Sequence, residues 1–134
     1  MNGKNPVVHF EMPYEDGARV GRFYADAFGW DMQQLSGEMG SYVLAHTAEM
    51  DENNMIKKPG AINGGFYPKS IPGASPHPSV VVSVENLHEA IGKVGVAGGT
   101  VVGEPIDIPG IGQYVSFTDT EGNRVGMLQP STPM

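Results

Sequence analysis

An internal repeat is the feature that most constrains the fold of this chain of 134 residues. A shift of about 70 residues places the start of the first half over the start of the second half. Two segments then coincide, Pro6-Val7-Val8-His9-Phe10-Glu11-Met12 and Pro76-His77-Pro78-Ser79-Val80-Val81-Val82. Residues 60–68 match residues 122–130 at a shift of 62. The repeat therefore predicts two similar structural modules in tandem.

Each copy contains a segment with the apolar spacing of an amphipathic helix. The apolar positions are Val20, Phe23, Tyr24, Ala27 and Phe28 in the first copy, and Leu87, Ala90, Ile91 and Val94 in the second. Asp16 and Asn86 suit the helix N-caps, because their side-chain oxygens can accept hydrogen bonds from free backbone N–H groups. Gly29 and Gly98-Gly99 are typical of helix C-terminal ends.

The segments around each helix read as strands. They are residues 6–12, 30–35, 42–47 and 60–68 in the first copy, and 76–82, 100–102, 113–119 and 122–130 in the second. Each copy is therefore strand, helix, strand, strand, strand, which predicts an α+β fold of two βαβββ modules forming a concave, cup-shaped mixed sheet. We place the modules at residues 1–68 and 79–134 of one structural unit, with a proline-rich linker at 69–78. The polar stretch 48–59 is expected to be a surface loop.

Alternation along the strands assigns the residues to faces. One row can pack on the helix, and it consists of Val8, Phe10 and Met12 in the first strand and of Val125 and Met127 in the last. The other row is then left for the concave face, where it comprises Val7, His9, Glu11, Arg124, Gly126 and Leu128.

Composition excludes several functional classes. The chain has no cysteine, which excludes thiolate zinc sites and thiol catalysis. With 8 basic and 15 acidic residues it lacks the positive surface that nucleic-acid binding requires. No apolar run approaches the roughly 20 residues of a membrane-spanning helix, and no basic-then-apolar leader opens the chain. We expect a cytoplasmic protein with neither nucleic-acid nor membrane partners.

Five motifs between Pro6 and Pro130 resemble the vicinal oxygen chelate superfamily, which includes glyoxalase I, extradiol dioxygenases, fosfomycin-resistance enzymes and bleomycin-sequestering proteins. The motifs are Val8-His9-Phe10-Glu11, Arg22-Phe23-Tyr24-Ala25-Asp26-Ala27-Phe28-Gly29-Trp30, Ile62-Asn63-Gly64-Gly65, Ile108-Pro109-Gly110-Ile111-Gly112 and Phe117-Thr118-Asp119-Thr120-Glu121-Gly122-Asn123. The chain looks most similar to the branch of lactoylglutathione-lyase-related proteins of uncertain activity.

The resemblance implies a divalent metal on the concave face, held by one residue from the first and one from the last strand of each module. The matching positions are His9, Ser79, Gly64 to within one residue, and Gly126. A stable transition-metal site needs three or four donor atoms, so we expect no resident metal and no other cofactor. Gly126 replaces the carboxylate that acts as the base in glyoxalase-type chemistry, which argues against lactoylglutathione lyase activity. A rearranged metal site of His9, Glu11 and His77 stays open as an alternative.

The glycines instead leave space at the floor of the cup, which favours a small organic ligand. His9 is the leading candidate for a catalytic or ligand-contacting residue, and Glu11 could orient it or act as a base. The predicted ligand-binding set is His9, Tyr42, Gly64, Phe66, Ser79, Tyr114, Phe117 and Gly126. Strict alternation sends some of these aromatic residues to the helix side.

Two functions of different class follow from these residues. The first is a binding protein for a small organic molecule, without the ancestral metal. The second is a metal-dependent or His9–Glu11 acid–base lyase, isomerase or dioxygenase of the same superfamily, so enzymatic activity is left open. The acidic, glycine-rich strand edges would permit a homodimer, which is the expected assembly.

Overall fold

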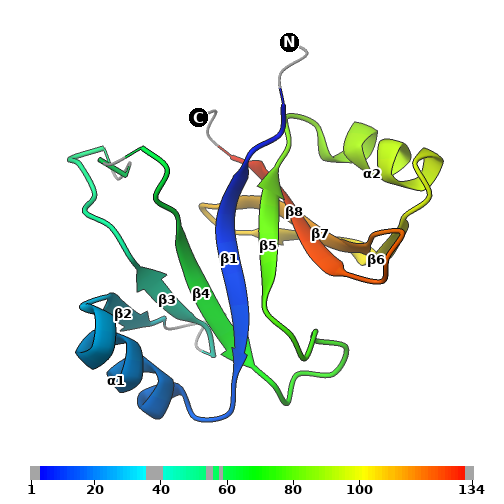
Figure 1. Ribbon diagram of the computed structural model, residues 1–134. Helices are drawn as coiled ribbons and strands as arrows, with labels where there is room; N and C mark the ends of the chain where they lie inside the picture. The colour runs from blue at the N-terminus through cyan, green and yellow to red at the C-terminus, as the bar shows by residue number, and fades with distance from the viewer. Residues whose placement is uncertain (1–3, 36–40, 54–55, 58, 132–134) are drawn as a thin grey trace. The chain divides into compact units, whose positions relative to one another are not determined.

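The protein is described by a computed structural model that covers residues 4–35, 41–53, 56–57 and 59–131. The chain divides into two compact units, shown in Figure 1. The first unit is His9–Pro78. The second unit is Ser79–Met134 together with Met1–Val8. The N-terminal segment is tied to the second unit by a hydrogen bond from the Ser83 N–H to the Pro6 carbonyl, 2.9 Å long.

Both halves of the chain follow the same order of elements, strand, helix and three strands. The first half contains β1 (Val7–Tyr14), α1 (Gly17–Phe28), β2 (Asp31–Gln34), β3 (Val43–His46) and β4 (Asn63–Pro68). The second half contains β5 (Ser79–Ser83), α2 (Leu87–Val96), β6 (Thr100–Ile108), β7 (Gly112–Thr118) and β8 (Arg124–Pro130). The expected α+β fold of two βαβββ modules is confirmed.

Each module forms a mixed sheet. In the first, the strand order is β2-β3-β4-β1, and only the β1–β4 pair is parallel. In the second, the order is β5-β8-β7-β6, and only the β5–β8 pair is parallel. The first and last strands of each βαβββ module therefore lie side by side, as a crossover through a helix requires.

The helix ends match the sequence signals. Asp16 and Asn86 have extended backbones and accept hydrogen bonds of 3.0 Å from the N–H groups of Arg19 and Glu89. Gly29 ends α1 in the left-handed conformation, at φ 73°. These caps replace hydrogen bonds that the first and last helical turns cannot make internally.

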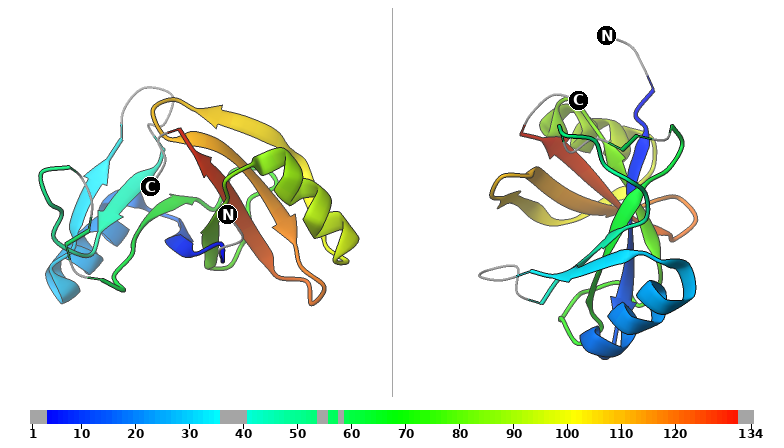
Figure 2. Two further views of the ribbon diagram at one scale, coloured as in Figure 1. Left: turned by 90° about the horizontal axis from the view of Figure 1, so that it is seen from above. Right: turned by 90° about the vertical axis from the view of Figure 1, so that its left-hand side faces the viewer.

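Each helix covers one face of its own sheet (Figure 2). In the first unit the buried core residues are Val43, Ala45 and Phe66, with Phe10, Met12, Tyr14, Val20, Tyr24, Trp30 and Met32 packed around them. Trp30 stacks on Tyr24, with ring centroids 4.7 Å apart. In the second unit the buried core residues are Val84, Leu87, Val115 and Met127. The helix-facing positions predicted for Phe10, Met12 and Met127 are thus confirmed.

Strand β6 is longer than the predicted residues 100–102. Its pairing with β7 shifts register between Val102 and Ile106, and Gly103 has φ 77°. A bulge of this kind lets a strand continue through a segment that reads as a turn. Pro105 is tolerated because β6 is the outer strand of its sheet.

Neither helix in the described part of the chain combines the length and the apolar character needed to cross a bilayer.

Candidate functional site

The first unit presents His9 and Glu11 on the sheet face opposite α1. Phe10 is paired with Gly64 and packs into the helix-side core. Alternation turns the neighbouring residues the other way, so His9 (paired with Asn63) and Glu11 (paired with Gly65) share the opposite face. We call this surface, with His9, Glu11 and Gly65, the His9 face. The strand pattern predicts His9 and Glu11 on this face. The alternation of β3 turns His46 to the same side of the sheet, since Val43 and Ala45 pack into the helix-side core.

Tyr42 connects the two residues. Its side chain comes from the position directly before β3 and reaches the His9 face. The Tyr42 hydroxyl lies 3.0 Å from His9 Nε2 and donates a 3.2 Å hydrogen bond to Glu11 Oε2. The sequence predicted Tyr42 as a ligand-binding residue but gave no reason to place it between His9 and Glu11. The structure thus forms one hydrogen-bonded chain from imidazole to phenol to carboxylate.

His9 is a neutral imidazole at pH 7. Burial lowers its pKa from 6.5 to about 4, because the partly buried ring loses the water that would stabilise its charged form. A neutral imidazole carries one N–H donor and one nitrogen acceptor. The site therefore offers a hydrogen-bonding group rather than a fixed positive charge.

Gly65, not Gly64, lies on the His9 face. A Cβ atom on Gly64 would overlap the Phe10 ring on the helix side, whereas a Cβ atom on Gly65 would overlap the Tyr42 phenol. The β1–β4 register, which pairs Gly65 with Glu11, explains the difference. Gly64 therefore lies on the helix side, and Gly65 is the residue that fits the position predicted as Gly64 to within one residue.

The second unit repeats the arrangement of glycine and tyrosine. Gly126 is paired with Val81 and Ser116, and a Cβ atom on it would lie 2.5 Å from the Tyr114 hydroxyl. Ser79 is two residues before Val81 and so shares its face. The space expected beside these glycines is thus occupied in both units, by Tyr42 over Gly65 and by Tyr114 over Gly126.

Two of the predicted ligand-binding aromatic residues face the helices instead. Phe66 is 1% exposed at the centre of the first core, and Phe117 packs against the second core. Both have the strand parity of core neighbours, Phe66 that of Gly64 and Phe117 that of Val115. The expectation that they line the ligand site is therefore corrected.

The donor set does not fit the divalent metal that the resemblance implies. In the first unit the two strand positions supply the His9 imidazole and no side chain at Gly65. In the second unit they supply the Ser79 hydroxyl and no side chain at Gly126. Among the described residues no three histidine or acidic side chains are grouped to bind a metal, so the alternative of His9, Glu11 and His77 is not formed. Transition-metal sites use three or four donors.

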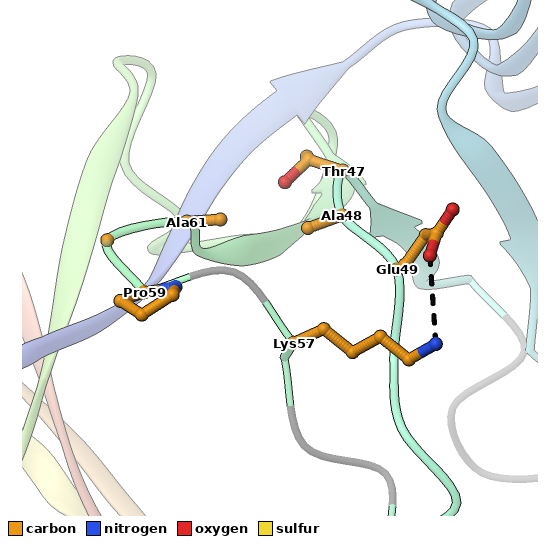
Figure 3. A pocket seen from close by; sticks show the side chains of 7 residues that line it. Thr47, Ala48, Glu49, Lys57, Pro59 and Ala61 are labelled. Carbon is orange, nitrogen blue, oxygen red and sulfur yellow. Dashed lines mark ion pairs between the residues drawn. The ribbon is translucent and has the colours of Figure 1, made fainter.

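An open hollow of about 830 Å³ lies in the loop between β3 and β4 (Figure 3). It is lined by Thr47, Ala48, Glu49, Lys57, Pro59, Gly60 and Ala61. The Lys57 and Glu49 side chains form an ion pair of 3.8 Å across it. Thr47 N–H donates to the Asn63 side chain (2.8 Å), and Asn63 is the strand partner of His9. The sequence predicted a polar surface loop at residues 48–59, but it did not predict a hollow there.

Comparisons with known proteins agree with this fold. Residues 7–47 match the family profile described as bleomycin resistance protein-like N-terminal. Over 81 residues the chain is 32% identical to "Putative glyoxylase CFP32" of Mycobacterium bovis, a match that covers 60% of this chain and 31% of that protein. The chain thus spans about a third of the length of this relative.

Solved structures match almost the whole chain. A variant of Streptomyces coelicolor methylmalonyl-CoA epimerase, in complex with 2-nitronate-propionyl-CoA, has a TM-score of 0.69 at 10% identity and covers 97% of this chain and 100% of that chain. These likenesses show that the chain has the vicinal oxygen chelate fold. Methylmalonyl-CoA epimerase from Mycobacterium tuberculosis has a TM-score of 0.66 at 13% identity, with coverages of 98% and 94%. At these identities the likeness is one of fold, and activity depends on the site.

Proposed function

We propose that this protein is a member of the vicinal oxygen chelate superfamily and binds a small organic molecule through the His9 face, without a divalent metal. The hydrogen-bonded chain of His9, Tyr42 and Glu11 is the observation that carries the proposal. His9 occupies the position of a metal ligand in superfamily enzymes, but its imidazole is neutral. Its Nε2 atom contacts the Tyr42 hydroxyl, and among the described residues it belongs to no group of three histidine or acidic side chains that could hold a metal. Sites for organic ligands commonly combine a few polar groups with apolar walls.

The fold neighbours support an organic ligand as well. The Streptomyces coelicolor epimerase was solved with 2-nitronate-propionyl-CoA, so the same fold holds an organic molecule in that protein. In this chain, the glycines at positions 65 and 126 supply no carboxylate, and tyrosine rings cover them. A glyoxalase-type proton transfer would lack its base at Gly126, which argues against lactoylglutathione lyase activity here.

An acid–base enzyme of the lyase or isomerase type is the second candidate. The same three residues favour it, because Glu11 can stabilise through Tyr42 the proton that His9 takes from a bound molecule. Turnover in the presence of a chelator, abolished by His9→Gln, would establish this function. A metal-dependent lyase or dioxygenase would instead require donors beyond the His9, Ser79, Gly65 and Gly126 positions.

Homodimerisation and a cytoplasmic location belong to the same proposal. Within the described sheets the outer strands β2 and β6 each have one neighbour, which leaves an edge able to pair with another chain. Light scattering should then give twice the 14.3 kDa chain mass. Cell fractionation tests the location.

Metal analysis followed by ligand screening tests the proposed function. Protein purified without chelators should contain far less than one equivalent of metal, and Ni²⁺, Zn²⁺, Mn²⁺ and Fe²⁺ should not raise its melting temperature. Organic compounds should raise the melting temperature of wild-type protein and of His88→Gln, a control at an exposed histidine on α2, but not of His9→Gln. Stoichiometric metal whose binding His9→Gln abolishes would refute the metal-free site.

A further inference from the structure

We infer that Tyr42 fixes His9 as the Nε2–H tautomer, so that His9 presents Nδ1 as an acceptor to a ligand carrying an O–H or N–H donor. Tyr42 is thus a positioning residue for His9. The inference deepens the proposed function and rests on it for the ligand, whereas the tautomer is a property of the free protein.

The first step is a count of protons on the Tyr42 hydroxyl. A phenol has one proton to donate. Glu11 Oε2, at 3.2 Å, belongs to a carboxylate that can only accept, and a hydrogen bond to a charged acceptor is stronger than one to a neutral imidazole. The proton therefore goes to Glu11. The Tyr42 oxygen then turns a lone pair towards His9 Nε2, 3.0 Å away, and that nitrogen must carry a hydrogen.

The second step concerns the other ring nitrogen. A neutral imidazole with hydrogen on Nε2 has a free lone pair on Nδ1. The hydrogen bond that the structure records for the His9 ring is through Nε2. No buried side-chain nitrogen or oxygen in the described part of the chain lacks a partner. Nδ1 therefore retains access to solvent and is the ring atom that a ligand can reach.

Glu11 sets this tautomer through Tyr42, because it accepts the proton of the Tyr42 hydroxyl. On the same side of the sheet as His9 are Glu11 on β1, Tyr42 before β3, Asn63 and Gly65 on β4 and, by strand alternation, His46 on β3. Neither of the two β4 residues titrates. Gly65 has no Cβ atom, which gives the Tyr42 ring its place over the sheet. The carboxylate, the phenol and the glycine thus act together on one imidazole nitrogen.

The ligand class follows from the acceptor. An unprotonated Nδ1 pairs with an alcohol, a phenol or an N–H group, and the donor brings the hydrogen. A carboxylate or phosphate would bring only lone pairs. Burial supports this choice, since the low pKa of His9 keeps the ring uncharged at pH 7.

Nitrogen NMR of the ligand-free protein tests the tautomer directly. The protein is labelled with ¹⁵N-histidine, and His9→Gln identifies the His9 signals among the four histidines. At pH 7 we expect a protonated-type shift for Nε2 and an unprotonated-type shift for Nδ1. Tyr42→Phe should move both shifts towards a mixture of tautomers. Tyr67→Phe, which removes a phenol hydroxyl bonded to the Ser75 carbonyl, should leave them unchanged.

Two outcomes would overturn the positioning role. One is a protonated Nδ1 in wild-type protein. The other is an unchanged His9 tautomer in a Tyr42→Phe variant whose backbone spectrum shows that it is folded. Neither outcome depends on finding a ligand. The positioning role can therefore fail while the proposed binding function stands, and the binding function can fail while the positioning role stands.

Phenol and anisole, a matched pair with and without an O–H donor, test the ligand class. Phenol should shift the His9 Nδ1 signal, and anisole should not. An equal response to both compounds, or no response to either at the solubility limit, would overturn the acceptor role of Nδ1.

Discussion

In the first unit Tyr42 lies over Gly65 beside His9 and Glu11, whereas in the second unit Tyr114 lies over Gly126 beside Ser79 and Val81. The strand registers make these positions equivalent, because Glu11 pairs with Gly65 as Val81 pairs with Gly126. The two units thus share a fold and a glycine–tyrosine contact. They differ in the residues next to it, which shows how a repeated scaffold can concentrate its acid–base groups in one copy.

The cores differ in composition as well. The first is built largely from aromatic rings, with Phe66 in edge-on contact with Phe10 at 6.5 Å and close to Tyr24 at 5.2 Å. The second consists of aliphatic residues and Met127, and Phe117 is the aromatic residue packed against it among the described residues. The same layered fold therefore tolerates two kinds of packing, provided that the strand parity is kept.

Removing the central ring of the first core should have the largest effect. Phe66→Ala leaves a cavity among the surrounding aromatic rings and should lower the free energy of unfolding by about 3–5 kcal/mol. Phe23→Ala, at a side chain 57% exposed, is the control and should cost far less. Urea denaturation measures both. Similar losses for the two variants would contradict the assignment of the first core.

The pH dependence of the free energy of unfolding should give the second largest effect, and this effect should come from the first unit. The pKa of His9 falls from 6.5 to about 4 on folding, so the unfolded chain binds its proton at a higher pH than the folded protein. Stability from this residue is complete above pH 6.5 and falls as the pH drops to 4, by at most about 3 kcal/mol. His9→Gln should make the urea midpoint depend less on pH over this range, whereas Ser79→Ala should leave the pH dependence of the midpoint unchanged. Equal pH profiles for wild-type protein and His9→Gln would contradict the burial of His9.

Alanine at Gly65 or at Gly126 should lower the free energy of unfolding by similar amounts, but the two variants should differ in their effect on the His9 ring. Gly65→Ala and Gly126→Ala each displace a tyrosine ring and should cost about 1–3 kcal/mol in urea denaturation. Gly65→Ala should also change the ¹⁵N shifts of His9, because Tyr42 lies within hydrogen-bonding distance of that ring, and Gly126→Ala should leave them unchanged. Combining Gly65→Ala with Tyr42→Ala should recover part of the loss from overpacking. A Gly65→Ala protein with unaltered stability and His9 signals would rule out the contact.

The helix caps should give the smallest effect and the same one in each unit. Asp16→Ala and Asn86→Ala each remove a side-chain acceptor from a helix N-terminus and should cost about 1 kcal/mol. Asp26→Ala, an exposed position within α1, is the comparison. A cap variant indistinguishable from Asp26→Ala in its urea midpoint would show that the cap contributes nothing to that unit.

The sequence predicts much of this molecule because its strongest signals are local. Alternation places His9 and Glu11 on one face, and side-chain oxygens at Asp16 and Asn86 mark the helix starts. Alternation in the predicted strand 42–47 turns Tyr42 away from the face of Val43, but it does not tell which residues of β1 the phenol reaches. Choosing between Gly64 and Gly65 requires the β1–β4 register, which depends on pairing across 54 residues of sequence between His9 and Asn63. From the sequence, Gly103 is interpreted as the end of a strand, whereas it lies in a bulge within β6.

The most direct test of metal-free recognition through His9 is an organic-fragment screen on ¹⁵N-histidine-labelled protein in the presence of EDTA. We predict that fragments with O–H or N–H donors shift the His9 signals and that the exposed His77 and His88 do not respond with them. Adding Zn²⁺ or Ni²⁺ to chelator-free protein should leave the His9 signals in place. His9 signals that respond to stoichiometric metal alone, or to no fragment, would contradict the account.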